Sequence, residues 1–224
     1  LNIAPIRLEL LESALEKVGD VPRRKFSAKW VARAERLDRE LHSSASRLML
    51  VRWLAVSWRL DEAEVALDTI PSEKDELTGA DTVARAYLSA GFLSRATILF
   101  VQNLVDRKRV LGPDHPDTLT SRNNLASAYR SAGKLEQAIH LHERNLADRE
   151  RILGPDHPDT LTSRNNLAYA YRSAGKLKES IPLYERNLAD RERILGPVHP
   201  YTLRSRNNLA SAYQDAGRLE QAIN

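Results

Sequence analysis

Residues 123–135 read NNLASAYRSAGKL, residues 165–177 read NNLAYAYRSAGKL, and residues 207–219 read NNLASAYQDAGRL. The three copies lie 42 residues apart, and the tripeptide Leu-Gly-Pro recurs at the same interval. Residues 111–152 differ from 153–194 at only six positions. A fixed period of this length predicts an array of repeated structural units.

The repeat extends upstream with weaker identity. Shifting the pattern back by one period predicts a diverged fourth unit over about 69–110. Leu54, Ala55 and Trp58 echo the same signature with a shorter turn, which leaves a fifth unit open. The expected organisation is a helical segment of unknown role over 1–43, diverged repeats over 44–110 and three 42-residue units over 111–224, the last one truncated.

Each unit has the pattern of two antiparallel helices. Apolar residues such as Leu119 and Leu125 share one side of a helix expected over 118–131, with Asp117 as its N-cap. Gly133 would end this helix in the left-handed conformation, and a second helix is expected from about 135 to 152. One such pair buries too little apolar surface to be stable alone, so the units must stack into an all-α solenoid with an inner binding face.

Composition excludes several classes of protein. The 224 residues carry a net charge of +4 from interleaved charges and contain no cysteine, which excludes disulfides and allows a cytoplasmic location. No apolar stretch is long enough to cross a membrane. The chain starts at Leu1 without a visible leader, as expected of an excised fragment. The pattern offers no catalytic residues and no cofactor motif, and the linker histidines lie a whole unit apart, so no metal site is expected.

The repeated signature resembles the tetratricopeptide repeat. The 42-residue period and the Leu-Gly-Pro-x-His-Pro linker resemble the kinesin light chain variety of that repeat. Arrays this uniform are similar to those of bacterial, especially actinobacterial, signalling ATPases of the STAND class, although no ATPase motif is present here. The resemblance implies a right-handed superhelical solenoid in which the first helix of each unit lines a concave groove. It also implies that Asn124, Asn166 and Asn208 contact the backbone of a bound peptide.

The residue pattern points to the same helix face. Thr120, Asn124 and Ser127 lie on a polar side opposite the apolar one, and an amide can both donate to and accept from a peptide backbone. In one alternative, the asparagines cap helices or bond to loops instead of contacting a ligand. In the other, the positions that differ between copies reflect neutral drift. Arginines on this face would favour an acidic ligand. The predicted partner-binding residues are Thr120, Asn123, Asn124, Ser127, Arg130, Thr162, Asn165, Asn166, Tyr169, Arg172, Arg204, Asn207 and Asn208.

The leading hypothesis is therefore a protein-interaction module of a larger bacterial signalling protein, and not an enzyme. Nucleic-acid binding through arginine-rich helices is the alternative, since the sequence pI is about 9.4. A purely structural spacer is a third possibility. Because a complete last unit would extend beyond Asn224, we also expect the chain to fray after about Arg218 or to self-associate through this unit.

Overall fold

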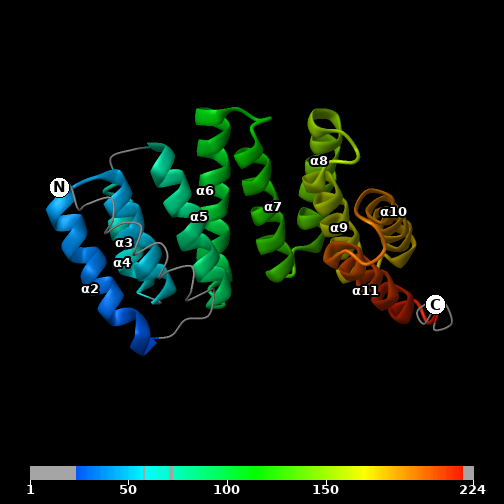
Figure 1. Cartoon of the computed structure of the whole chain (residues 1–224), viewed down its shortest axis with the longest axis horizontal. Coiled ribbons are helices and arrows are strands. Elements are labelled where there is room, and N and C mark those ends of the chain that lie inside the picture. Colours follow the sequence, from blue (N-terminus) through cyan, green and yellow to red (C-terminus); the bar gives the residue numbers. More distant parts are fainter. Residues whose placement is uncertain (1–23, 58, 71–72, 219–224) are drawn as a thin grey trace. The chain divides into compact units, whose positions relative to one another are not determined.

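The computed structural model of the chain describes residues 24–57, 59–70 and 73–218. The chain divides into two compact units, Leu1–Leu111 and Gly112–Asn224. Within the described ranges the secondary structure consists of helices and turns, with no strand. In each unit, helices that follow one another in the chain pack side by side (Figure 1). The predicted all-α fold of helix pairs is confirmed.

The first unit packs around helix α3. This helix contacts α2, α4 and α5, and α5 in turn packs against α6. Gly79 of α5 lets α5 approach α4 closely, since an added Cβ would lie 2.6 Å from the Leu67 Cδ1 atom. The bounds of the helices are α2 Arg24–Leu41, α3 Ser44–Val56, α4 Leu60–Leu67, α5 Glu73–Ser89 and α6 Leu93–Leu111.

The diverged repeats predicted from sequence fall in this unit. Helices α5 and α6 form the helix pair of the stretch expected over 69–110. Helices α3 and α4 also pack together, but α4 has only 8 residues, where the second helix of the regular repeat has 19. Trp58, on which the idea of a fifth unit partly depended, lies outside the described residues.

The second unit contains the near-identical repeats. Helix α9 packs between α8 and α10, and α11 packs against α10. Helix α10 continues through Pro182, which lies at an exposed position. The bounds of the helices are α7 Pro116–Ser131, α8 Leu135–Leu153, α9 Pro158–Ser173, α10 Leu177–Leu195 and α11 Pro200–Asp215.

The prediction that Asp117 caps the first helix of the repeat was wrong. Helix α7 starts at Pro116, and its cap is His115, whose Nδ1 atom accepts a hydrogen bond of 3.1 Å from the Asp117 backbone N–H. Proline suits this first position because the N–H that it lacks would have no partner inside the helix. His157 and His199 cap α9 and α11 in the same way, which gives the linker histidines a structural role.

Gly133 ends the α7 helix as predicted. Its φ angle is 72°, in the left-handed region that side chains with a Cβ atom avoid. An added Cβ would meet no atom within 4 Å, so glycine is required here for backbone conformation and not for space. Gly175 repeats this geometry, with the same φ angle, after α9.

Replacing Gly133 and Gly175 with alanine should therefore lower the free energy of unfolding by about 1 kcal/mol at each position. Chemical denaturation of the single and double variants measures this loss. Asparagine tolerates the left-handed conformation, so Gly133→Asn and Gly175→Asn are the matched controls and should cost clearly less. Equal losses for alanine and asparagine would contradict a conformational origin.

Candidate functional site

The predicted site residues lie along the first helices of the repeats in the second unit. Helices α7, α9 and α11 each carry the motif Asn-Asn-Leu-Ala in mid-helix, and the neighbouring polar positions are exposed or half-buried. We call the polar side of these three helices, which faces away from their packed apolar side, the helix A face. It consists of Thr120, Asn124, Ser127 and Arg130 on α7, Thr162, Asn166, Tyr169 and Arg172 on α9, and Arg204, Asn208 and Ser211 on α11.

The asparagines link successive repeats to each other. The Asn166 Nδ2 atom donates to Asn123 Oδ1 at 2.8 Å, and Asn208 Nδ2 donates to Asn165 Oδ1 at 2.8 Å. The first asparagine of one motif thus accepts from the second asparagine of the next. Since an amide has two N–H donors and one acceptor oxygen, Asn166 and Asn208 each retain a further N–H and an oxygen for other partners. The expected ligand contacts therefore share these side chains with a structural bond.

The two arginines of the face have different surroundings. The Arg130 guanidinium lies over the Tyr169 ring, 4.5 Å from its centroid. Arg172 Nε instead pairs with Asp215 Oδ2 at 2.5 Å, and this hydrogen bond raises the pKa of Arg172. Tyr169 is 40% exposed, so its ring and Arg130 together present an aromatic and cationic surface. Asp215 already neutralises much of the charge of Arg172.

The position that Thr120 holds in the first regular repeat is not occupied by the same residue type in all three copies. Thr120 Oγ1 accepts a long bond of 3.4 Å from Arg149, and Thr162 donates to the backbone oxygen of Pro158 at 2.9 Å. In the third repeat this position is Arg204, which is exposed and lies 5.8 Å from the Tyr201 ring centroid. The face therefore gains a cation where the other two copies have a hydroxyl.

A buried polar junction joins each repeat to the next. Arg149 of α8 is 6% exposed, and its Nη1 atom donates to Asp159 O and Ser163 Oγ of α9, both at 3.0 Å. Asn145 adds a bond of 3.3 Å to the same serine. Burial lowers the pKa of Arg149, but a guanidinium with two oxygen partners remains charged.

The same junction recurs one period later. Arg191 Nη1 donates to Tyr201 O at 2.9 Å and to Ser205 Oγ at 3.1 Å, and Asn187 donates to Ser205 at 3.4 Å. In the first unit, Asn103 and Arg107 hold the equivalent positions on α6, and both donate to the backbone oxygen of Leu77.

A second buried arginine lies beside this junction. Arg164 has a side chain of 0% exposure and pairs with Asp190 at 2.5 Å and with Glu150 at 3.0 Å, so it joins α9 to both neighbouring helices. Arg122 pairs with Asp148 and Arg206 with Glu192 at matching places. The sequence pattern did not predict that these buried arginines and asparagines join neighbouring repeats. The available signal was that polar residues on the packed side, such as Asn145 and Arg149, stay identical between copies.

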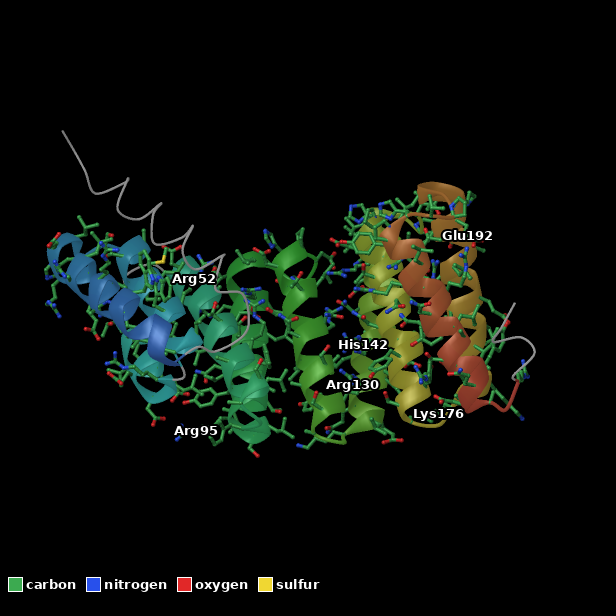
Figure 2. The ribbon with its side chains drawn as sticks, turned by 60° about the horizontal axis from the view of Figure 1, so that its bottom comes forward. Arg52, Arg95, Arg130, His142, Lys176 and Glu192 are labelled. Carbon is green, nitrogen blue, oxygen red and sulfur yellow. The ribbon has the colours of Figure 1, made fainter. Side chains whose placement is uncertain are left out.

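Behind the helix A face lies a buried aromatic position that differs between copies. It is His142 in α8, 2% exposed, and Tyr184 in α10, fully buried. Burial, and then the positive charge of Arg130, lowers the pKa of His142 from 6.5 to about 4. Figure 2 shows His142 and Arg130 close together in the second unit. His142 is therefore neutral in the folded protein at physiological pH.

Two kinds of feature are absent from the described ranges. Among residues 24–57, 59–70 and 73–218, no group of three or more histidines and carboxylates is arranged to hold a metal ion. In the same part of the chain, no helix is both long and apolar enough to span a bilayer.

Comparison with known families agrees with this geometry. The model of the tetratricopeptide repeat matches residues 76–147, 123–189 and 164–224, which together cover most of the chain. The chain belongs to the tetratricopeptide repeat family. No curated protein matches it in sequence. These repeats and their relatives indicate a module for protein–protein interaction.

Several solved structures have a similar fold. The nearly identical repeats of a Podosopora anserina protein described as a kinesin light chain are 30% identical, with 80% of this chain and 88% of that chain covered at a TM-score of 0.68. BtubC from P. vanneervenii is 18% identical, with coverages of 100% and 88% and a TM-score of 0.69. A Rap protein complexed with competence and sporulation factor is 13% identical, with coverages of 99% and 62% and a TM-score of 0.68.

The buried His142 predicts a pH-dependent stability. Because its pKa is about 4 in the folded chain and near 6.5 when unfolded, the unfolded state takes up the proton first as the pH falls. The contribution of neutral His142 to the free energy of unfolding is fully present above pH 6.5 and is lost progressively as the pH falls toward 4. Between about pH 7.5 and about pH 5 the folded state should lose roughly 2 kcal/mol through this residue.

Urea denaturation at the two pH values measures this loss. The His142→Tyr variant copies the Tyr184 position of the next repeat and has no group that titrates in this range, so it is the matched control. Over the same pH change, its free energy of unfolding should fall by about 2 kcal/mol less than that of the parent chain. The same pH dependence in both proteins would contradict the assignment to His142.

Proposed function

We propose that the helix A face of the second unit binds an extended peptide segment of a partner protein. The observation that carries this proposal is the asparagine series. Asn166 and Asn208 are held in place by the preceding repeat and still have an N–H donor and an oxygen to offer. Donor and acceptor pairs at a regular spacing suit a peptide backbone, which offers both groups at every residue.

We further propose that the ligand is acidic. Arg130 over Tyr169 and the exposed Arg204 are cations on this face, and the guanidinium group pairs well with carboxylates. Arg172 supports the preference less, since Asp215 already pairs with it. Nucleic-acid binding is less well supported, because several exposed arginines elsewhere in the unit are paired with carboxylates, among them Arg151 with Asp114 and Arg193 with Asp156.

The wider role that fits these features is the recruiting arm of a larger signalling protein. In this proposal residues 111–224 are the binding region, and the near-identical repeats resemble the uniform arrays of bacterial signalling ATPases. The lack of cysteine fits a reducing compartment such as the cytoplasm. Self-association through the last repeat stays a separate proposal, which light scattering of the chain over a range of concentrations would test.

Replacing Asn124, Asn166 and Asn208 together with alanine should weaken binding of an acidic peptide by tenfold or more, which is about 1.4 kcal/mol or more. A set of synthetic acidic peptides, measured by fluorescence anisotropy, provides the probe. Circular dichroism should show an unchanged helix content, because alanine favours helix more than asparagine does.

A matched control separates the ligand role from the structural bond. Asn123→Ala with Asn165→Ala removes the acceptors of the two asparagine bonds but leaves the second asparagine of each motif in place. This variant should lose stability, and it should bind the peptide clearly more tightly than the triple variant, because the second asparagines are still present. If the triple variant binds as tightly as the parent chain, the asparagines are structural only.

Charge reversal at Arg130 and Arg204 tests the acidic preference. The double variant Arg130→Glu, Arg204→Glu should bind acidic peptides about tenfold less tightly and basic peptides more tightly. Arg172→Gln with Asp215→Asn is the comparison and should have a smaller effect, because it removes a pair of opposite charges without changing the net charge. An unchanged ranking of acidic and basic peptides would remove the arginines from the site.

A further inference from the structure

Helix α6 of the first unit carries an apolar stripe on its outward side. Ile98 is 63% exposed, Val101 38% and Val105 58%. Their spacing of three and four residues places them on one side of the helix, over a length of about 10 Å from Ile98 to Val105. We call these three residues the α6 stripe.

The regular repeats have no apolar stripe at these positions. One and two periods later, Ile98 corresponds to His140 and Pro182, Val101 to Glu143 and Glu185, and Val105 to Ala147 and Ala189. These counterparts are exposed as well. The repeat fold therefore does not require large apolar side chains at these places. A contiguous apolar surface that folding does not explain indicates an interaction surface.

An arginine lies beside the C-terminal end of the stripe. Arg109 continues the same side of α6 one turn beyond Val105, and its side chain is 62% exposed. It also forms an ion pair of 3.6 Å with Asp106 on the same helix. Arg95 precedes Ile98 at the margin of the first unit (Figure 2), but its guanidinium is held by Asp61 at 2.6 Å and by the Tyr87 hydroxyl oxygen at 2.9 Å.

We propose that the α6 stripe is a docking surface for an amphipathic helix of a second partner protein. The stripe is a straight row of about two helical turns, and a facing helix with apolar residues at three- and four-residue spacing can pack along such a row. Arg109 selects a partner that carries acidic residues beside its apolar ones. This surface is separate from the helix A face, so it goes beyond the peptide binding proposed above.

The test uses the full chain and a labelled synthetic helical peptide with leucines at three- and four-residue spacing and glutamates between them. Fluorescence anisotropy should show that this peptide binds about tenfold more tightly than the same peptide with lysines in place of glutamates. Ile98→Glu with Val105→Glu should weaken binding by about tenfold or more. Arg109→Glu should reverse the preference between the two peptides.

A matched control places the same charge on another repeat. His140→Glu with Ala147→Glu occupies the counterparts of Ile98 and Val105 on α8 and should leave peptide binding unchanged. Circular dichroism shows whether each variant remains folded. If the α6 variant stays folded and binds the peptide normally, or if the α8 variant loses as much affinity, the proposal is wrong.

Two other occupants of the stripe would also overturn the proposal. If light scattering shows a dimer that Ile98→Glu with Val105→Glu converts to a monomer, the occupant is a second copy of this chain. If Leu11→Glu with Leu15→Glu tightens peptide binding, residues 1–23 of the chain itself compete for the stripe.

Discussion

The buried guanidinium at the end of each second helix is the constraint on which the array of the second unit depends. Arg149 and Arg191 are almost fully buried, and a buried charge is costly unless oxygen atoms surround it. Those oxygens come from the backbone and a serine in the early turns of the following helix. A shift of the following helix by one residue would move its oxygens away and leave the charge without partners. The junction therefore fixes the register of each repeat against the next.

This register brings the asparagines of neighbouring repeats within bonding distance. Asn166 meets Asn123 and Asn208 meets Asn165 at the same distance of 2.8 Å, which shows that both junctions have nearly the same geometry. In the binding mode proposed above, a partner meets amide groups at a regular spacing along the helix A face. The affinity of such a surface benefits because its groups are already held in place before binding.

Variation between the copies occurs largely at positions that the junction does not use. Tyr169 and Arg204 change the chemistry of the helix A face, and the α6 stripe changes the outer side of a second helix. The exchange of His142 for Tyr184 shows that even a buried position can vary when both side chains fill the same place. One framework can thus carry different surfaces on different repeats, since the bonds between repeats do not depend on them.

The sequence by itself determined the period, the helix pairs and the glycine that ends each first helix, because these depend on local patterns repeated without change. The second helix of the repeat was predicted to within one residue. The first helix starts at Pro116 and its cap is His115, because a histidine nitrogen can accept the hydrogen bond usually expected from aspartate or serine. Only the tertiary structure decided how the polar residues are used. Asn123 was predicted to contact a ligand and Arg164 was assigned no partner, but the partners of both lie on other helices, 14 to 43 residues away in sequence. No local pattern reveals such distant pairing, because it depends on how the helices stack.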